Sequence, residues 1–318
     1  MLPPRAPRSQ PALSRFDECD GRPTKWRAPR RQSRPRTLNP RGRGASSTYS
    51  GHHRRTGMRR LEGKAIIVTG GGSGIGRGAC LRIAEEGGLV GVADIRGSLA
   101  VAVAAEVTSA GGRAVALTCD VSREDQVEKM VADTLSRFGS LHGLVANAGT
   151  AGSGWIHETT LADWQFVLGV NLTGPFLCAK HSLPPMLEAG GGSIVITSSI
   201  AGSVIGAGGA AASYAVSKHG VIGLAKQIAV DYGSQGIRAN AIQPAAVDET
   251  NLGKHAAEDR RSAQTPPAQL PRPKSWLPIR RAGKIKDEYG ATIAFLLSDD
   301  AGYITGAALA VDGGYLAT

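Results

Sequence analysis

The sequence predicts an α/β protein in which a doubly wound parallel sheet carries helices on both faces, as three αβα layers in a single domain. Short runs rich in β-branched residues alternate with helical patterns along most of the 318-residue chain. These apolar runs lack the strict alternation of half-exposed strands, as is typical of parallel strands that are covered on both faces. The chain from Met58 onward also has the length of one large α/β domain.

The first two elements illustrate how the others are assigned. The run KAIIVTG at 64–70 is apolar and β-branched, and GRGACLRIAEEG at 76–87 has apolar residues at helical spacing. Ligands of such sheets bind beyond the carboxyl ends of the strands. The same reasoning gives strands at 64–70, 89–95, 113–121, 141–149, 193–199, 237–247 and 308–314, and helices at 76–87, 98–111, 123–139, 161–190, 213–236 and 287–302.

Residues 248–284 interrupt this alternation with a polar, proline-rich stretch. A long irregular insertion in a compact domain is usually a lid or a mobile loop. We therefore expect a catalytic domain over 58–318 that carries a lid at about 248–284.

The formal net charge of +11 lies in residues 1–57, because acidic and basic residues balance from Met58 onward. This leader is rich in Arg, Pro, Ser and Gly, so we predict that it is disordered. It could be a basic arm for nucleic acid, an organellar transit peptide, or the product of a translation start placed too early. Its prolines and the acidic stretch DECD are unlike a transit helix, and Met58 lies just ahead of the first strand. We favour the third interpretation and expect no nucleic-acid partner.

The cysteines Cys19, Cys80, Cys119 and Cys178 are scattered without the spacing of a metal site or a disulfide framework. We therefore expect reduced thiols, no bound metal and a cytoplasmic location. The longest uncharged stretch, 189–217, is dense in Gly and Ser with only a short apolar centre, so we predict no membrane span.

A glycine-rich turn, TGGGSGIG at 69–76, stands between the first strand and the first helix. Glycines allow a tight turn and a close approach of the backbone to a pyrophosphate, which the free N–H groups of the helix N-terminus attract. The alternative is a structural turn that binds nothing. We expect the dinucleotide to contact Gly70, Ser73, Gly74, Ile75 and Gly76.

Asp94 ends the second strand, about twenty residues beyond this turn. A carboxylate there can accept hydrogen bonds from both ribose hydroxyls of an adenosine and would repel a 2′-phosphate. We therefore expect NAD rather than NADP. The alternative is an aspartate that only caps the next turn, and Arg96 nearby weakens the preference.

Tyr214 and Lys218 stand four residues apart in a helical pattern and therefore share one face. A free tyrosine has a pKa of about 10, and a neighbouring ammonium favours its phenolate. Lowering that pKa by about 3 units needs roughly 4 kcal/mol, which Lys218 and the positive ring of an oxidised nicotinamide could supply. The pair would then exchange protons with an alcohol or a carbonyl. The alternative is a lysine that merely packs over a phenol.

Two further polar residues favour the chemical interpretation. Ser199 ends a strand fifteen residues before Tyr214, where its hydroxyl can hold a substrate oxygen against the phenol. Asn171 interrupts an apolar helical pattern and could hold a water linked to Lys218. The alternative for Asn171 is a buried amide that only satisfies a backbone group.

Together these residues resemble the short-chain dehydrogenase/reductase family, whose single-domain members have a Rossmann-like fold. The resemblance extends from about Leu61 to the C-terminus. Its motifs in chain order are TGGGSGIG at 69–76, CDV at 119–121, NAG at 147–149, the set Asn171, Ser199, Tyr214 and Lys218, and ITGAALAVDGG at 304–314.

The resemblance assigns a role to each of these residues. It implies that Tyr214 is the acid and base, that Ser199 orients the substrate, and that Lys218 holds the nicotinamide ribose. It further implies that Asn171 completes a proton relay. The cofactor contacts expected in all are Gly70, Ser73, Gly74, Ile75, Gly76, Asp94, Asp120, Val121, Asn147, Tyr214, Lys218 and, through its backbone, Val247.

Three departures from the family pattern affect the loops. Ala245 replaces the usual glycine after Pro244. The expected threonine comes one place late at Thr250, with Glu249 in its position. The segment between Ser199 and Tyr214 is about two residues longer than usual. None of these departures removes a catalytic group.

We therefore expect an NAD(H)-dependent oxidoreductase that interconverts a small secondary alcohol, cyclic alcohols included, and its ketone. The loop at 149–157 should line the substrate pocket, and its apolar and aromatic members such as Trp155 suggest a substrate other than a sugar. One alternative is an NADPH-dependent 3-oxoacyl-thioester reductase, and another is a dinucleotide-binding regulator without turnover. Because family members are commonly tetramers, the resemblance also implies a homo-oligomer, a tetramer or a dimer, formed through the helices with Asn171 and Tyr214.

Overall fold

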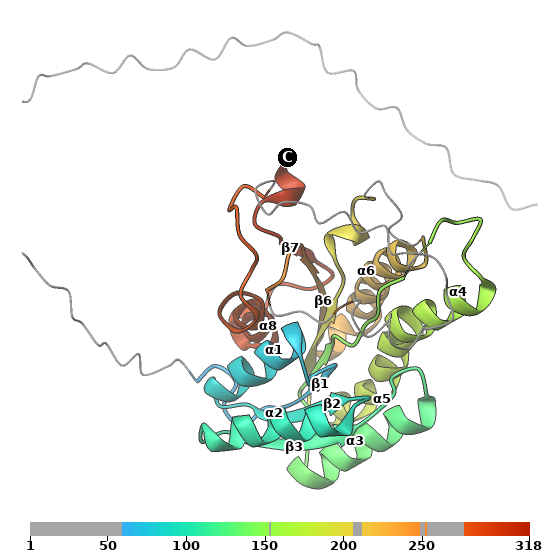
Figure 1. Cartoon of the computed structure of the whole chain (residues 1–318). Coiled ribbons are helices and arrows are strands. Elements are labelled where there is room, and N and C mark those ends of the chain that lie inside the picture. The colour runs from blue at the N-terminus through green and yellow to red at the C-terminus, as the bar shows by residue number, and fades with distance from the viewer. Residues whose placement is uncertain (1–58, 153, 206–211, 249–251, 253–276) are drawn as a thin grey trace, which may run out of the picture. The chain divides into compact units, whose positions relative to one another are not determined.

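Seven parallel strands form the sheet, in the order β3-β2-β1-β4-β5-β6-β7 (Figure 1). The structure is a computed structural model that describes residues 59–152, 154–205, 212–248, 252 and 277–318. The predictions for the leader and for most of the lid lie outside the described residues. The strands are β1 (Ala65–Thr69), β2 (Leu89–Asp94), β3 (Arg113–Thr118), β4 (Gly143–Ala146), β5 (Gly192–Thr197), β6 (Ile237–Pro244) and β7 (Ala308–Val311).

Strands β1 to β3 are added toward one edge of the sheet, and strands β4 to β7 are added toward the other edge, so the chain order changes sense between β1 and β4. In doubly wound sheets this reversal opens a crevice at the carboxyl ends of the strands, where ligands bind. The predicted fold class is confirmed, and every predicted strand is present.

The helices alternate with the strands along the chain. The long α-helices are α1 (Gly74–Glu85), α2 (Gly97–Ser109), α3 (Glu124–Phe138), α4 (Leu161–Leu168), α5 (Gly174–Glu188), α6 (Ala212–Tyr232) and α8 (Ala291–Leu297). Short π-helical or 3₁₀ segments are η1 (Gly169–Thr173), η2 (Ile200–Gly202), η3 (Gly233–Gln235), η5 (Ile285–Gly290), η6 (Asp299–Ala301) and η7 (Tyr315–Ala317).

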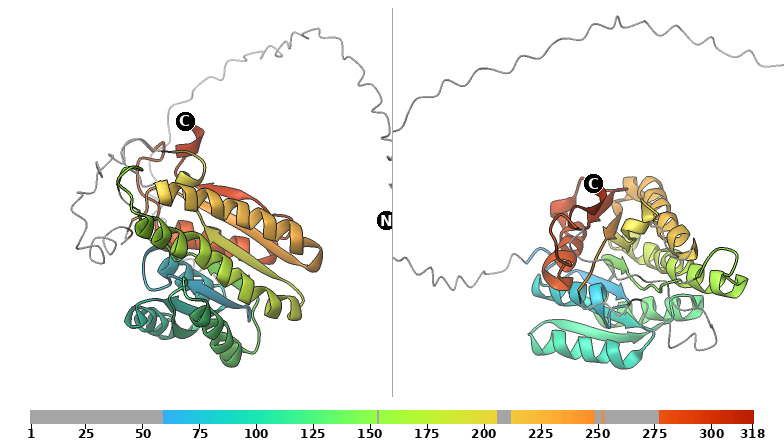
Figure 2. Two further views of the ribbon diagram at one scale, coloured as in Figure 1. Left: turned by 90° about the vertical axis from the view of Figure 1, so that its right-hand side faces the viewer. Right: turned by 45° about the horizontal axis from the view of Figure 1, so that its top comes forward.

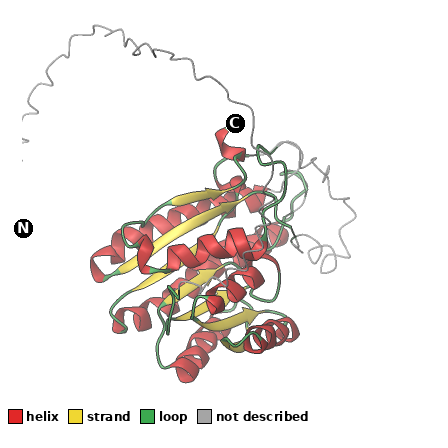
Figure 3. Cartoon of the chain, turned by 90° about the vertical axis from the view of Figure 1, so that its left-hand side faces the viewer, coloured by secondary structure: helices red, strands yellow, loops and turns green. Residues whose placement is uncertain are grey.

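Two hydrophobic cores lie on opposite faces of the sheet, which the helices cover as layers (Figure 3). Successive strand residues point to opposite faces. Ile67 therefore joins the core with α3, α5 and α6, whereas Ile66 and Val68 join the core with α1, α2 and α8. This alternation explains why the strands are apolar throughout rather than at every second position.

Most elements are a few residues shorter than predicted, and three differences have a clear structural form. The helix predicted at 161–190 is α4, the π-helical η1 and α5 in direct succession. The strand predicted to reach Val247 ends at Pro244, because a proline has no N–H to continue a ladder. The last predicted helix begins two residues earlier, as the π-helical η5, and α8 ends at Leu297.

Helix α1 packs closely against η5 from the C-terminal part of the chain, and the two segments adjoin in Figures 1 and 2. A Cβ on Gly78 would lie 2.3 Å from the carbonyl oxygen of Ile285, and one on Gly290 would lie 2.7 Å from that of Gly78. Both positions therefore require glycine. Helix α1, which follows the glycine-rich turn, is thus held in place by η5.

Among the described residues, no helix has the length and apolar character needed to cross a membrane. Cys80, Cys119 and Cys178 are free and buried, and burial raises the pKa of each thiol. Buried thiols of this kind behave as small apolar side chains.

Candidate active site

The glycine-rich turn joins β1 to α1 at the carboxyl edge of the sheet. Gly70 and Gly74 have φ angles of 62° and 52°, in the left-handed region that favours glycine. A Cβ on Gly76 would lie 2.1 Å from the carbonyl oxygen of Gly70. The turn is therefore as tight as its sequence predicts, and the first N–H groups of α1 have no acceptor within the helix.

Ser73 and Ile75 take different places in this turn. Ser73 precedes α1 with extended backbone, and its hydroxyl makes no capping hydrogen bond. Ile75 packs against the core on the α1 face. Only Ser73 therefore keeps its side chain available for a phosphate, and Ile75 can contribute through its backbone.

Asp94 is buried, with 6 % of its surface exposed. Its Oδ2 accepts a hydrogen bond of 3.0 Å from the Gly72 N–H, and its Oδ1 accepts one of 3.0 Å from the Arg96 N–H. The Arg96 side chain comes within 3.8 Å of the same carboxylate. Asp94 thus organises the turn, as the capping alternative requires. A carboxylate has about four acceptor positions, so two remain for a ribose.

Asn147, at the end of β4, connects three strands of the sheet. Its Nδ2 donates to the carbonyl oxygen of Thr69 at 3.0 Å, and its Oδ1 accepts from the Thr197 hydroxyl at 3.1 Å. Its backbone N–H donates to Thr69 Oγ1 at 3.0 Å. The carboxyl ends of β1, β4 and β5 are therefore held together by one amide.

Ser199 follows β5 and begins the η2 turn in extended backbone. Its Oγ accepts a hydrogen bond of 3.1 Å from the Ala201 N–H. Its side chain also interacts with Tyr214, and this interaction lowers the pKa of the phenol. Because the N–H of Ala201 occupies a lone pair, the hydroxyl proton of Ser199 is left to donate elsewhere.

Tyr214 and Lys218 lie on one face of α6, as their spacing predicts. Lys218 Nζ lies 5.7 Å from the centre of the Tyr214 ring. It donates a hydrogen bond of 2.8 Å to the carbonyl oxygen of Thr197, at the end of β5. The lysine is 4 % exposed. A buried ammonium beside a phenol is the arrangement that acid–base catalysis by tyrosine needs.

Burial changes the pKa of both groups. Desolvation lowers the pKa of Lys218 to about 8. Desolvation also raises the pKa of Tyr214, and the hydrogen bond with Ser199 opposes that rise. In the protein by itself the phenol is therefore protonated at neutral pH, and the expected lowering of its pKa must come from a bound cationic group.

Asn171 lies in the π-helical η1, where it is 1 % exposed. Its Oδ1 accepts from the Thr150 N–H at 2.8 Å, and its Nδ2 donates to the Thr150 carbonyl at 2.9 Å and to Ser217 Oγ at 3.2 Å. The two contacts with Thr150 satisfy backbone groups, as the alternative interpretation of Asn171 as a structural amide requires. A Cβ on Gly149 would nevertheless lie 3.4 Å from Asn171 Oδ1 and 3.6 Å from Lys218 Nζ, so the amide and the ammonium approach the same point.

Asp120 and Val121 follow β3 at the same edge. Asp120 Oδ1 accepts from both the N–H and the hydroxyl of Ser122, at 2.9 and 2.7 Å. Val121 is 5 % exposed, and a Cβ on Gly174 would lie 2.7 Å from its Cγ2. Val121 therefore packs inside the protein between the β3 edge and the start of α5.

Val247 lies beyond β6 and pairs with Gly283 in an isolated bridge. The Asp248 N–H donates to the Gly283 carbonyl at 3.1 Å. Positive φ outside glycine is confined to Arg280 among the described residues, so Ala245 adopts a conformation open to any residue. Glu249 and Thr250 lie outside the described residues.

The structure thus brings Asn171, Ser199, Tyr214 and Lys218 together beside Asn147, next to the glycine-rich turn. Sequence reasoning missed several residues that support this set. Ser198 donates to the Lys218 carbonyl and Ser217 accepts from Asn171, both in buried hydrogen bonds, while Thr69 accepts from the Asn147 N–H and Gln243 on β6 contacts the Ser199 turn. Their partners are distant in the chain, which leaves no local signal in the sequence.

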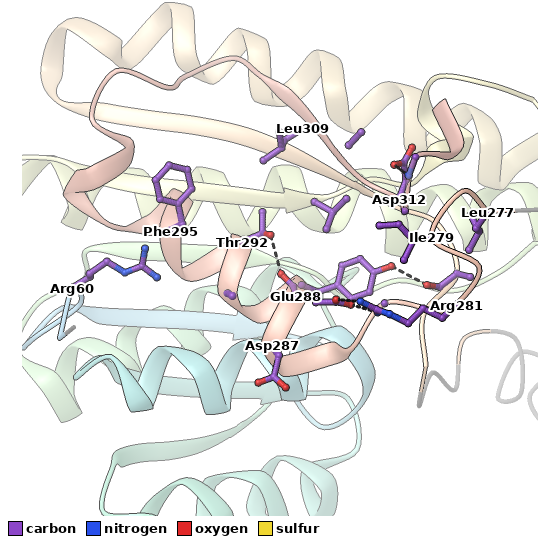
Figure 4. Close-up of a pocket in the computed structure, with 18 residues that line it drawn as sticks. Arg60, Leu277, Ile279, Arg281, Asp287, Glu288, Thr292, Phe295, Leu309 and Asp312 are labelled. Carbon is purple, nitrogen blue, oxygen red and sulfur yellow. Dashed lines mark hydrogen bonds and ion pairs between the residues drawn. The ribbon is translucent and has the colours of Figure 1, made fainter. Parts of the chain in front are cut away.

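A separate cavity of about 710 Å³ lies among η5, α8 and β7 (Figure 4). Its lining includes Ile279, Tyr289 and Leu309, and Figure 4 shows Arg281 directed at Glu288, with which it forms an ion pair. None of the predicted site residues, all of which are described, lines this cavity. It touches the site only indirectly, since the Tyr289 hydroxyl donates to the Ala246 carbonyl at 2.9 Å.

Residues 70–316 match the family model described as Enoyl-(Acyl carrier protein) reductase. The 2,5-dichloro-2,5-cyclohexadiene-1,4-diol dehydrogenase of Sphingobium indicum is 40% identical over 262 residues, which are 82% of this chain and 100% of the relative. The 2-(S)-hydroxypropyl-CoM dehydrogenase 3 of Xanthobacter autotrophicus is 38% identical over 258 residues, 81% of this chain and 98% of the relative.

The crystal structure of levodione reductase covers 81% of this chain and 100% of its own, at 34% identity and a TM-score of 0.72. The chain therefore belongs to the short-chain dehydrogenase/reductase family. It is an oxidoreductase of the class that acts on CH–OH groups.

Proposed function

We propose that this protein is an NAD-dependent dehydrogenase of small, ring-bearing secondary alcohols, in which Tyr214 is the acid and base. The observation that carries the proposal is the buried Lys218 ammonium 5.7 Å from the Tyr214 ring. Ser199 interacts with the same tyrosine and lowers its pKa. This group lies at the carboxyl edge of the sheet beside the glycine-rich turn, where a nicotinamide and a substrate would meet.

The residues present fit a nicotinamide dinucleotide. Gly70 and Gly76 let the backbone of the turn pack directly against Ala148 and against itself, and Gly74 adopts left-handed backbone. The turn therefore ends beside the free N–H groups of α1, which suits a pyrophosphate. Asp94 would accept from the ribose hydroxyls of the adenosine, and Lys218 would donate to the nicotinamide ribose. When bound, the cofactor accepts or supplies the hydride.

Each residue of the proposed catalytic set has a distinct task. In alcohol oxidation, Tyr214 takes the hydroxyl proton of the substrate, while Ser199 donates to the same oxygen and holds it in place. Lys218 stabilises the phenolate. In ketone reduction, the protonated Tyr214 gives its proton to the carbonyl oxygen. Asn171 and Lys218 would hold the water through which the proton is exchanged with solvent.

The protonation state of Tyr214 supports reversible use of the site. Burial raises the pKa of the phenol in the protein alone, which favours the acid form needed for ketone reduction. A positive charge in the cofactor site favours the phenolate needed for alcohol oxidation. Tyr214 would therefore follow the redox state of whatever occupies the cofactor site.

Exposed apolar side chains support a ring-bearing substrate. Trp155 and Ile156 follow β4 and are 54 % and 79 % exposed, and Ile205 follows η2 and is 75 % exposed. These segments leave the carboxyl edge, where they would surround the substrate. The relative from Sphingobium indicum is named for a cyclohexadiene diol.

A reductase of acyl-carrier-protein thioesters is the second candidate, because the matching family model carries that description. Such reductases would use NADPH by our sequence-based expectation, and the Asp94 carboxylate would repel its 2′-phosphate. We further propose a homo-oligomer that forms through α4, α5 and α6, and a cytoplasmic location.

The test is a panel of cyclic and acyclic secondary alcohols incubated with the full chain and either NAD or NADP. Absorbance of the reduced cofactor should rise fastest with a cyclic alcohol and NAD. Binding of NADH is measured separately by fluorescence. Binding without turnover on any alcohol or ketone would leave the non-catalytic regulator as the better description, and turnover restricted to NADPH with a 3-oxoacyl thioester would favour the second candidate.

A further inference from the structure

Gln243 is a buried amide at the carboxyl end of β6 to which the proposed function gives no task. It is 3 % exposed. Its Nε2 donates to the Ser199 carbonyl at 3.3 Å and to Ser203 Oγ at 2.5 Å. The two contacts lie on either side of η2, so one side chain connects both ends of the turn that begins at Ser199.

The chemistry of the partners fixes the orientation of this amide. A backbone carbonyl can only accept hydrogen bonds, so the amide nitrogen of Gln243 and not its oxygen must face Ser199. The pleat of β6 also directs Gln243 to the correct side of the sheet. Ala239 and Ala241, at alternate positions, belong to the core that α6 covers. Gln243 is the next residue in this series and points toward the face that carries Tyr214.

The hydrogen bond between Gln243 and Ser199 lies just beyond the last backbone bond between β5 and β6. The backbone bonds between β5 and β6 extend to Ser198, whose N–H donates to the Ile242 carbonyl at 2.9 Å. At the next residue along each strand, the side chain of Gln243 supplies the donor to Ser199. The Ser199 carbonyl is therefore held by an amide from the neighbouring strand, in addition to the Gly202 N–H of its own turn at 2.9 Å, rather than by the regular ladder.

From these contacts we propose that Gln243 is a positioning residue for the reaction, which holds the Ser199 hydroxyl against Tyr214 by fixing the Ser199–Ser203 turn. The proposal rests on the proposed function, because it assigns Ser199 a task in that function. Gln243 and Ser203 would then affect catalysis although neither residue contacts the substrate.

The part of the Ser199–Ser203 turn around Gly202 is held by close packing, so the Gln243 contacts matter mainly for the two ends of the turn. A Cβ on Gly202 would lie 2.4 Å from Ser198 Oγ and 2.6 Å from the Lys218 carbonyl. The middle of the turn therefore lies against α6 itself. If the Gln243 contacts are lost, the end at Ser199 can shift relative to the helix that carries Tyr214.

The test compares Gln243→Met, which keeps the length of the side chain but removes the donor, with the wild-type full chain. We expect kcat to fall about ten- to a hundredfold, as for a misplaced reacting group. Affinity for NADH, measured by fluorescence, should stay within about twofold, because the glycine-rich turn is unchanged. A crystal structure of the variant should show Ser199 displaced from Tyr214.

The pH profile provides a readout that a purely structural role would not change. Among the residues that the structure describes, Ser199 from the turn and Lys218 from α6 itself lie beside the Tyr214 phenol. The hydrogen bond from Ser199 lowers the pKa of Tyr214, so losing it raises that pKa. Alcohol oxidation needs the phenolate, and its rising limb should therefore move to higher pH in Gln243→Met.

Asn240→Leu is the matched control. Asn240 lies on the same strand, is fully buried, donates to the Ile304 carbonyl at 2.9 Å and accepts from the Ala307 N–H at 3.0 Å. These partners are away from the Ser199 turn. Asn240→Leu should lower the thermal midpoint at least as much as Gln243→Met, yet leave kcat and the pH profile of the folded protein unchanged.

Ser203 keeps the proposal testable if Gln243→Met does not fold, because its side chain lies in an exposed turn. Ser203→Ala should lower kcat about threefold or more and move the pH profile in the same direction, and Ser203→Thr should restore both, since it retains the hydroxyl. A wild-type kcat and pH profile in both Gln243→Met and Ser203→Ala would overturn the inference while the proposed function stands. If the wild-type chain itself turns over no alcohol or ketone, the proposed function fails, and the role of Gln243 fails with it.

Discussion

The glycine-rich turn and the end of β5 lie along the same edge of the sheet, and they are constructed differently. At the turn, backbone meets backbone: a Cβ on Gly76 would lie 2.1 Å from the Gly70 carbonyl oxygen. At the end of β5, polar side chains enter the interior: Lys218 is 4 % exposed and Asn171 is 1 % exposed. The first region depends on the absence of side chains, and the second depends on side chains that are costly to bury.

This difference separates two kinds of sensitivity. A steric site is damaged by any added atom and is indifferent to charge. A buried polar site tolerates isosteric replacement sterically but loses its chemistry, and it lowers the stability of the fold while it is intact. Substitutions in the two regions should therefore affect binding, turnover and stability in different combinations.

The largest expected effect is that of Tyr214→Phe in the polar region. Removing the hydroxyl takes away the proton donor and acceptor, so kcat should fall about a hundred- to ten-thousandfold. NADH binding, followed by fluorescence, should remain close to wild type because the glycine-rich turn is intact. A variant with nearly normal kcat would refute the acid–base role of Tyr214.

The next largest effect is expected for Gly76→Ala in the steric region. The added methyl group collides with the Gly70 carbonyl and with Asn147 Nδ2, 2.7 Å away, so the free energy of unfolding should fall by about 1–3 kcal/mol. NADH affinity should fall as well. Urea unfolding and fluorescence titration measure the two quantities.

Gly223→Ala is the control for this substitution. Gly223 lies within α6, and a Cβ there would meet nothing within 4 Å. Alanine is the better helix former, so this variant should be stabilised by about 0.5–1 kcal/mol and keep its activity. Equal stability losses in Gly76→Ala and Gly223→Ala would show that close backbone approach is not what the turn requires.

Lys218→Met tests the cost of the polar region. The folded state holds the ammonium with a pKa of about 8, below its ordinary value of 10.5, so the unfolded state binds the proton more tightly. This penalty is fully present below about pH 8 and disappears as the pH rises toward 10.5. At pH 7 the variant should lose activity and yet gain about 1–2 kcal/mol of stability, less whatever the unpaired Thr197 carbonyl costs.

Urea unfolding of Lys218→Met at pH 7 and at pH 10 provides the measurement. Wild-type stability relative to the variant should improve at the higher pH. Lys226→Met, on an exposed position of the same helix, should show no such dependence. A Lys218→Met variant that is less stable than wild type at pH 7 and equally so at pH 10 would contradict the stated burial cost.

Asp94→Ala should have the smallest effect, on cofactor choice. Removing the carboxylate removes a repulsion of the 2′-phosphate, so the ratio of kcat/KM for NAD to that for NADP should fall about tenfold. Because Asp94 also accepts from the N–H groups of Gly72 and Arg96, Asp94→Asn is a useful companion that removes the charge but keeps an acceptor. An unchanged ratio in both variants would show that Asp94 only organises the turn.

The sequence was informative where a single residue type is required by local geometry. Gly70 and Gly74 adopt left-handed backbone that favours glycine, and the spacing of Tyr214 and Lys218 follows directly from the helical repeat. The strand and helix order followed from apolar runs that the two cores explain. These features depend on neighbours in the chain, and so a sequence can display them.

Features that depend on distant partners could not be predicted. The contact of Gln243 with Ser199 joins residues 44 positions apart. The π-helical segment around Asn171 adds one residue to a turn without disturbing the apolar pattern on either side. We expected Lys218 and a bound oxidised nicotinamide together to lower the pKa of Tyr214, and the protein alone adds an opposing effect, since burial raises that pKa. Burial is a property of the whole fold, which the spacing of two residues does not reveal.

The single amide of Asn147 that joins β1, β4 and β5 has a consequence for where the chain can tolerate change. Because it ties these strand ends directly to one another, the spacing between them owes little to the segments that leave the edge. Substitutions in the stretches around Trp155 and Ile205 should therefore leave the spacing of these strand ends unchanged.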